Sequence, residues 1–277
     1  MSETWINGQQ GTLVNTYNRG LTYGDGVFAT MRVDDRGSIQ FFNTHCVRLE
    51  QASHRLKFRN GSSFWTLSPS LKSQLIKLAK SNPNRGIKFL LTRGEGGRGY
   101  SPSSDPTYTE IITLFDLPVH YCYWQSHGIA LAMSDVKLAK QPLLAGIKHL
   151  NRLEQVLIKS TVLPKGFDDW LALDQNEKVA ESSMANIFAL IDDVWCTPEM
   201  TNCGVSGVMR EQMLKALPKM NYSVSITELS LTQLFNAKHV FITNSIFGIV
   251  GINQIEQQHF EAWDGVGHLQ KILGVAL

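Results

Sequence analysis

The sequence has little cysteine, little excess charge and no long apolar run. Its four cysteines, Cys46, Cys122, Cys196 and Cys203, are scattered without a CxxC pair, so they indicate reduced thiols rather than a disulfide framework. The formal net charge is +2 over 277 residues with both signs interspersed, which argues against a nucleic-acid or membrane surface. No window reaches the length of a membrane span, and residues 1–5 do not resemble a signal peptide. These absences predict a soluble, cytoplasmic protein.

The chain is long enough for two modest domains, each with its own hydrophobic core. We expect an α/β protein with a smaller N-terminal domain over residues 1–118, a linker over 119–127 and a larger C-terminal domain over 128–277. The local patterns predict a short strand and turn over 5–8, strands over 38–42, 87–92, 109–114, 128–134, 170–173, 187–191 and 240–242, and helices from a Thr44 N-cap to about Leu56 and over 71–79, 151–160 and 208–217.

Residues 144–157 (LAGIKHLNRLEQVL) place Lys148 in an apolar bend, just after a glycine and before an amphipathic helix. A lysine that is desolvated on one side has a lowered pKa and a nucleophilic amine, which is what Schiff-base chemistry requires. Taken alone, a single lysine is far more often a solvated surface residue. The interpretation therefore depends on whether the chain also supplies groups for a phosphate and for a pyridine nitrogen.

Glu181 is a candidate partner for a pyridine nitrogen, because it lies among small residues in the stretch 181–188 (ESSMANIF). A buried glutamate needs a cationic partner, since an unpaired buried carboxylate is costly. A protonated pyridine nitrogen would serve, and the pair would strengthen the ring as an electron sink. The alternative is a solvated glutamate in a loop.

Three segments offer groups for a phosphate. Residues 202–210 bring two glycines to the start of a predicted helix, where backbone N–H groups and the positive end of the helix dipole attract anions. Arg48, on the predicted helix after Thr44, can grip a phosphate through paired donors. Residues 243–245 end an apolar strand with hydroxyl and amide side chains. Each segment has an ordinary alternative, because many glycine-led helices bind nothing and most arginines on helices face solvent.

Three further patterns do not support a function of their own. Residues 94–99 match G-x-G-x-x-G, but the prolines at 102 and 106 prevent the helix that dinucleotide binding requires. His120, Cys122 and His127 lack a second ligand pair at zinc-site spacing, so no metal site is expected. Residues 204–208 do not form a nucleophile elbow, because the second glycine comes one position too early.

Five motifs stand out along the chain, at residues 19–32 (RGLTYGDGVFATMR), 92–100 (TRGEGGRGY), 146–157, 181–188 and 204–210 (GVSGVMR). Through these motifs, which occur in the family's order, the chain resembles the fold type IV pyridoxal 5'-phosphate (PLP) enzymes, the group that contains the branched-chain and D-amino-acid aminotransferases, and within that group the aminodeoxychorismate lyases. The lysine segment is highly specific, whereas the YGDGVF segment is shared with the aminotransferases. The resemblance implies a fold type IV architecture with PLP in the cleft between the two domains, and a homodimer.

The resemblance also implies a role for each matching residue. Lys148 would bind PLP covalently, and Glu181 would bind its pyridine nitrogen. The phosphate would be held by Arg48, the backbone of Val208 and Met209, and Ser245 with its neighbour Asn244.

On the substrate side, the resemblance places Thr30 near the substrate and matches Arg98 and Tyr100 to a loop that reaches toward it. A lyase of this group would convert 4-amino-4-deoxychorismate into 4-aminobenzoate and pyruvate, in folate biosynthesis. Lys148 would remove the ring proton, and either Lys148 or Thr30 would protonate the leaving group. Ala29 departs from the pattern, because relatives often carry a hydroxyl there.

Two alternatives remain open. A branched-chain or D-amino-acid aminotransferase would use the same lysine, glutamate and phosphate groups but must also admit a 2-oxo acid. A non-catalytic PLP-binding protein would share the scaffold, although the presence of both Lys148 and Glu181 argues against it.

Overall fold

A computed structural model describes residues 3–277, which divide into two compact units. Unit 1 contains the chain up to Leu117 together with Ile147–Asn151, and unit 2 contains Pro118–Gly146 and Arg152–Leu277. Residues 147–151, expected in the second domain, therefore group with the first unit. The stretch expected as a linker over 119–127 contains helix α4 (His120–His127), which buries two of its aromatic side chains.

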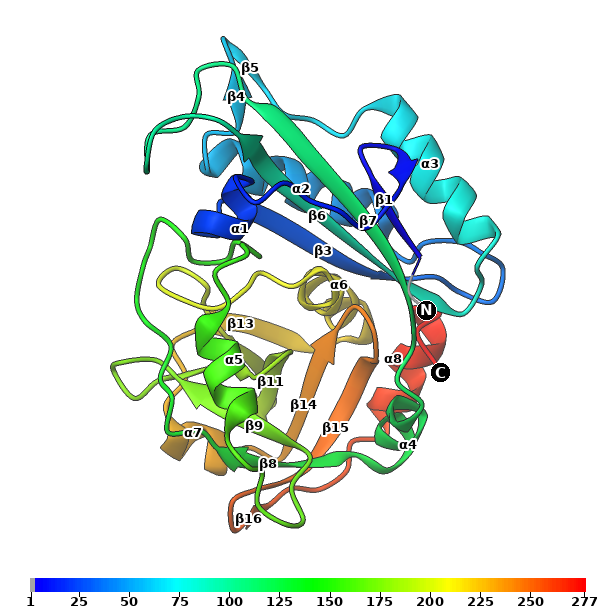
Figure 1. Cartoon of the computed structure of the whole chain (residues 1–277). Helices are drawn as coiled ribbons and strands as arrows, with labels where there is room; N and C mark the ends of the chain where they lie inside the picture. Colours follow the sequence, from blue (N-terminus) through cyan, green and yellow to red (C-terminus); the bar gives the residue numbers. More distant parts are fainter. Residues whose placement is uncertain (1–2) are drawn as a thin grey trace. The chain divides into compact units, whose positions relative to one another are not determined.

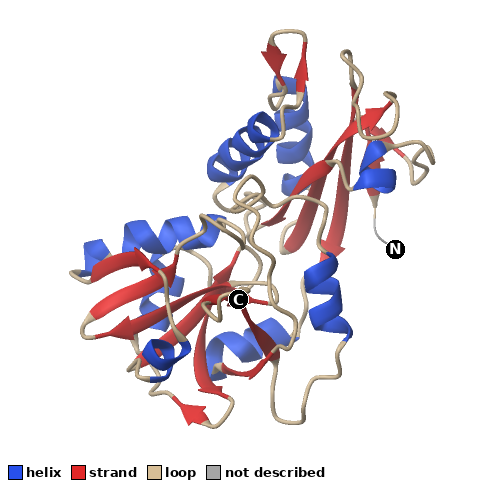
Figure 2. Ribbon diagram, turned by 90° about the vertical axis from the view of Figure 1, so that its left-hand side faces the viewer, coloured by secondary structure: helices blue, strands red, loops and turns tan. Residues whose placement is uncertain are grey.

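Unit 1 is an antiparallel five-stranded sheet with two helices packed on one face (Figure 2). The strand order is β2-β1-β7-β6-β3, which leaves β3 at an edge. A two-stranded hairpin stands apart from this sheet. The elements are β1 (Thr4–Ile6), β2 (Gln9–Gln10), α1 (Arg19–Tyr23), β3 (Gly26–Arg32), α2 (Phe42–Arg55), β4 (Arg59–Asn60), β5 (Ser63–Phe64), α3 (Pro69–Lys80), β6 (Arg85–Glu95) and β7 (Thr107–Asp116).

Strand β3 separates the core of unit 1 from an open face. Its odd-numbered residues, including Val27 and Met31, are buried in the cluster that contains Leu49 of α2 and Leu75 of α3. Because side chains alternate along a strand, Phe28 and Thr30 lie on the opposite face, away from the two helices. Phe28 and Thr30 therefore lie on the face of the sheet that the two helices do not cover, which is called the open face below.

Two local predictions in this unit are wrong. Residues 38–42 form no strand, since only Ile39 makes an isolated bridge to Val33. Helix α2 begins at Phe42 rather than after Thr44, and the residue before it, Phe41, adopts a left-handed conformation with φ 53°. By contrast, Ser68 caps α3 through the backbone N–H of Leu71, and this helix covers the predicted stretch 71–79.

Residues 147–151 extend the sheet of unit 1 at its β3 edge. The N–H of Phe28 donates to the carbonyl of Lys148 at 2.9 Å, and the N–H of Leu150 donates to the carbonyl of Gly26 at 2.9 Å. Ile147 is buried in the core of this unit. This pairing explains why a segment so far along the chain belongs to unit 1.

Unit 2 is a mixed sheet in the order β10-β9-β8-β15-β14-β11-β12-β13, with β16 paired to β15. The pairs β8–β9, β8–β15 and β12–β13 are parallel, and the others are antiparallel. The strands are β8 (Ile129–Met133), β9 (Asp169–Leu173), β10 (Val179–Ser182), β11 (Asn186–Ile191), β12 (Val194–Pro198), β13 (Ser223–Thr227), β14 (His239–Asn244), β15 (Gly248–Ile255) and β16 (Gln258–His259).

The helices of unit 2 are anchored to its sheet by side-chain amides as well as by apolar contacts. Helices α4 and α8 lie beside β15 (Figure 1), where Gln270 of α8 donates to the carbonyl of Ile249 at 2.9 Å. Helix α5 begins at Leu153, two residues later than expected. Within residues 3–277, none of the helices combines the length and the hydropathy needed to cross a membrane. The remaining helices are α5 (Leu153–Ser160), α6 (Val208–Ala216), the 3-10 turn η1 (Pro218–Met220), α7 (Leu231–Phe235) and α8 (Gly265–Ile272).

Candidate functional site

Lys148 projects from the edge of the unit 1 sheet on its open face. Its backbone pairs with Phe28, so the two side chains lie side by side, and Lys148 Nζ is 4.6 Å from the centre of the Phe28 ring. The preceding residue, Ile147, points into the core and fixes the alternation that turns Lys148 away from it. The structure thus holds this amine against an apolar ring rather than on a charged surface.

Thr30 and Lys88 lie on the same open face. Thr30 is two residues beyond Phe28 on β3, and the strand register places Lys88 of β6 opposite it. Lys88 Nζ lies 5.4 Å from the centre of the Phe28 ring. Lys88 was missed in the sequence, because only the β3–β6 register brings it to this face.

Arg48 and His45 lie one helical turn apart on α2. Burial lowers the pKa of Arg48 to about 10, which leaves its guanidinium charged at neutral pH. His45 is fully buried, and within the described residues neither of its ring nitrogens has a hydrogen-bond partner. Burial lowers the pKa of His45 well below 6.5, and the charges of Arg48 and Lys148 lower it further. A neutral imidazole therefore lies close to both cations.

The loop that carries Arg98 and Tyr100 is held by its backbone and leaves its side chains exposed. Arg19 donates to the carbonyls of Gly99 at 2.9 Å and Tyr100 at 3.1 Å. Asp25 Oδ2 accepts from Arg19 and also from Arg93, at 2.9 and 2.8 Å. Tyr100 is 89% exposed, so a loop with a fixed backbone presents an aromatic side chain to solvent.

Glu181 is a buried carboxylate on β10 of unit 2, with only 5% of its surface exposed. Its Oε2 accepts from the backbone N–H of Val205 at 3.0 Å and from Asn186 Nδ2 at 3.4 Å. The guanidinium of Arg152 is also near: burial lowers the pKa of Arg152, and the carboxylates of Glu181 and Glu154 oppose that shift. Sequence reasoning expected a cationic partner for Glu181 but missed Arg152 and Asn186.

The start of α6 offers backbone donors in unit 2. Gly207 precedes Val208 and Met209, and no side chain caps this end of the helix. Arg210 fixes the first turn by donating to the carbonyl of Pro198 at 2.8 Å. The first N–H groups of an uncapped helix suit an anion.

Asn244 and Ser245 lie where β14 turns into β15. Asn244 Oδ1 accepts from the backbone N–H groups of Ile246 and Phe247, both at 2.9 Å, and its Nδ2 donates to the carbonyl of Met184 at 3.3 Å. The Asn244 amide therefore shapes the turn that displays Ser245, which is only partly buried.

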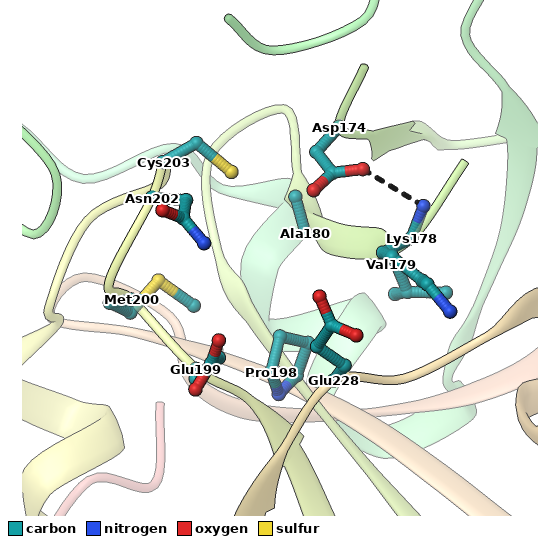
Figure 3. A pocket seen from close by; sticks show the side chains of 10 residues that line it. All are labelled: Asp174, Lys178, Val179, Ala180, Pro198, Glu199, Met200, Asn202, Cys203 and Glu228. Atoms are coloured by element: carbon teal, nitrogen blue, oxygen red, sulfur yellow. Dashed lines mark hydrogen bonds between the residues drawn. The ribbon is translucent and has the colours of Figure 1, made fainter. Parts of the chain in front are cut away.

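A small polar pocket lies against β10, the strand that carries Glu181 (Figure 3). Three carboxylates, those of Asp174, Glu199 and Glu228, line it together with the thiol of Cys203. Burial, reinforced by the carboxylates of Asp174 and Glu181, raises the pKa of Cys203 to about 11, so this thiol is protonated and is no nucleophile. None of the expected site residues lines this pocket. Among residues 3–277, no group of three or more His, Cys, Asp or Glu side chains is arranged to hold a metal ion.

Known proteins resemble this chain over nearly its whole length. The model of the family "Amino-transferase class IV" matches residues 26–255. An aminodeoxychorismate lyase of Vibrio harveyi is 36% identical over 255 residues, which cover 91% of this chain and 90% of that protein. The crystal structure of 4-amino-4-deoxychorismate lyase from Pseudomonas aeruginosa has a TM-score of 0.90 at 31% identity, covering 98% of this chain and 97% of the other.

A more distant structure shares the fold alone. A branched-chain amino acid aminotransferase from T.th., solved with pyridoxamine 5'-phosphate, has a TM-score of 0.81 at 20% identity. The match covers 98% of this chain and 92% of the other.

Proposed function

Because the chain belongs to the class IV amino-transferase family, we propose that it is a PLP-dependent aminodeoxychorismate lyase, which converts 4-amino-4-deoxychorismate into 4-aminobenzoate and pyruvate. The α/β fold type IV architecture expected from the sequence is confirmed by the family match and the solved structures. The lyase is favoured over an aminotransferase because the lyase relatives are 36% and 31% identical, whereas a D-alanine aminotransferase of Listeria innocua is 27% identical and the aminotransferase structure is 20% identical.

The residues of each unit fit PLP. Unit 1 supplies an amine, Lys148, and a partly buried guanidinium, Arg48, near one neutral imidazole. Unit 2 supplies the buried carboxylate of Glu181 and the uncapped start of α6. These groups match an aldehyde, a phosphate and a pyridine nitrogen in charge and in donor type.

The observation that carries the proposal is the position of Lys148 beside Phe28 and Thr30 on the open face of β3. When bound, PLP supplies an electron sink for charge that develops as the substrate loses its ring proton. Lys148 Nζ would take that proton from the carbon that bears nitrogen, and the Glu181 carboxylate would keep the pyridine nitrogen protonated, so that the ring can accept the electron pair. Departure of the enolpyruvyl group makes the ring aromatic, and Lys148 Nζ or Thr30 Oγ1 delivers the proton that completes pyruvate.

The exposed side chains of the two units suggest further contacts. We expect Arg98 and Tyr100 to contact the substrate, because their loop is fixed while their side chains face solvent. We also expect a homodimer, because α5 exposes an apolar face formed by Leu153, Val156 and Leu157. The scattered cysteines favour a reducing compartment, so we expect it in the cytoplasm.

A comparison of substrates tests the proposal. The purified protein with PLP should have a far higher kcat/KM for aminodeoxychorismate than for L-leucine or D-alanine supplied with 2-oxoglutarate. An aliphatic amino acid offers no enol-ether leaving group and gains no aromaticity. A higher kcat/KM for either aliphatic amino acid would instead support the aminotransferase.

A further inference from the structure

Asn186 connects two groups of unit 2 that the proposed function assigns to opposite ends of PLP. It is the first residue of β11 and is 4% exposed. Its Nδ2 donates to the carbonyl of Val205 at 2.8 Å and lies 3.4 Å from Glu181 Oε2. The N–H of Val205 donates to the same Oε2 at 3.0 Å. Asn186, Val205 and Glu181 therefore form a closed set of hydrogen bonds inside the unit.

The other atom of the Asn186 amide faces the start of helix α6. A Cβ at Gly207 would overlap Asn186 Oδ1, so the glycine backbone lies directly against the amide. Gly207 has φ −69°, a value open to any residue, and the amide rather than the backbone conformation excludes a side chain there. One buried carboxamide thus contacts the Glu181 carboxylate on one side and the N-cap residue of α6 on the other.

We propose that Asn186 is a positioning residue that fixes the Glu181 carboxylate relative to the N–H groups of Val208 and Met209. This inference rests on the proposed function, in which those groups hold the pyridine nitrogen and the phosphate of the same cofactor. A buried carboxylate and a buried peptide carbonyl both lose a donor if the amide is removed, and each unsatisfied group is costly. Loss of the Asn186 amide would therefore change the positions of both the Glu181 carboxylate and the start of α6.

The first test measures PLP affinity by titration of the cofactor-free protein, together with the free energy of unfolding in urea. Asn186→Ala should weaken PLP binding by about ten- to a hundredfold, the range expected when a hydrogen bond to a charged group is lost. Gln270→Ala is the matched control, because it removes another buried carboxamide that donates to backbone carbonyls of unit 2. It should lower stability and leave PLP affinity unchanged.

A second comparison separates an effect through Glu181 from a general loss of packing. Asn186→Asp keeps the shape but places a second carboxylate beside Glu181, so it should weaken PLP binding more than Asn186→Ala. In a protein that also carries Glu181→Gln the repulsion between the two carboxylates is gone. Asn186→Asp and Asn186→Ala should then weaken PLP binding by the same factor. Equal effects of Asp and Ala in the parent protein would overturn the inference, as would unchanged PLP affinity in both.

If Asn186→Ala and Asn186→Asp do not fold, a size exchange between Gly207 and the smaller polar substitution Asn186→Ser still tests the contact. Gly207→Ala should weaken PLP binding by displacing the amide, and it should have little further effect in an Asn186→Ser protein, where space is available. Additive effects of the two changes would contradict the inference. Failure of the unsubstituted protein to bind PLP would overturn the proposed function itself, whereas normal binding by every variant would overturn only the role of Asn186.

Discussion

Lys148 and Phe28 are paired at the edge of the unit 1 sheet through both backbone and side chain. The Phe28 N–H donates to the Lys148 carbonyl at 2.9 Å, and Lys148 Nζ lies 4.6 Å from the centre of the Phe28 ring. Hydrogen bonding fixes the main chain, and strand alternation fixes the side of the sheet on which the amine emerges. A catalytic amine needs such a fixed origin, because base catalysis depends on the distance to the proton that is removed.

Replacement of Lys148 by alanine should abolish the visible absorption band of protein-bound PLP and lower kcat by several orders of magnitude. In the proposed function the same amine serves as covalent anchor and as base. Lys88→Ala is the control, since it removes the other amine near the Phe28 ring and should keep the band. Rapid turnover by the Lys148→Ala protein would show that the assignment is wrong.

Glu181→Gln should leave the protein folded and lower kcat by about 100-fold, with a smaller effect on PLP affinity. The amide keeps an oxygen for the Val205 N–H but loses the charge that stabilises a protonated pyridine nitrogen. The measurement is kcat beside the PLP dissociation constant. Glu154→Gln, which removes another carboxylate near Arg152, is the control. An unchanged kcat would indicate that Glu181 is only structural.

The buried His45 should make stability depend on pH. Its pKa is lowered in the folded protein, so at pH values below about 6.5 the unfolded chain binds a proton that the folded protein does not. The contribution of the neutral His45 to the free energy of unfolding is complete above about pH 7 and is lost as the pH falls below about 6.5. Between about pH 7.5 and 5.5, the unfolding free energy should decrease by about 1 kcal/mol more than in a His45→Leu protein.

His54→Leu provides the control for this measurement, because His54 is exposed on the same helix. Urea unfolding of the three proteins at the two pH values gives the comparison. The same pH dependence in the His45→Leu protein as in the parent would contradict a neutral buried imidazole.

Leu157→Glu should convert the proposed homodimer into a monomer. Leu157 is 57% exposed on the apolar face of α5, and a charge placed in an apolar contact is costly. Light scattering after size-exclusion chromatography gives the mass of each species. Ile226→Glu on β13, at a similarly exposed apolar residue, should leave the dimer intact. A parent protein that is monomeric would refute the dimer proposal.

Local patterns predicted those parts of the fold that local interactions determine. The helix expected over 71–79 is present as α3, because its cap, Ser68, and its apolar spacing lie within one stretch of sequence. Stretches rich in β-forming and apolar residues likewise predicted the strands at 87–92 and 109–114, which the structure extends at both ends as β6 and β7. The Thr44 cap was wrong because the left-handed Phe41 starts the helix earlier, and sequence pattern does not reveal that conformation.

The sequence predicted which residues belong to the candidate site, but not which residues contact them in the folded protein. Lys148 and Glu181 belong to specific motifs, and their expected chemistry follows from the residues themselves. The pairing of Lys148 with Phe28 joins segments 120 positions apart, so no window of sequence contains it. Arg152 was missed for the same reason, because the loop before α5 brings it near Glu181. Asn186 is only five positions from Glu181, but its hydrogen bond to that carboxylate depends on how the chain turns from β10 into β11.

The most direct test of the proposed lyase is turnover of aminodeoxychorismate with no other substrate present. A lyase leaves PLP in its aldehyde form after each cycle, whereas an aminotransferase converts it to the amine form and stops without a 2-oxo acid. The purified protein with PLP should therefore release many equivalents of pyruvate and 4-aminobenzoate per active site, and its visible absorbance should recover fully when the substrate is exhausted. A single equivalent of product followed by arrest, relieved by 2-oxoglutarate, would contradict the account.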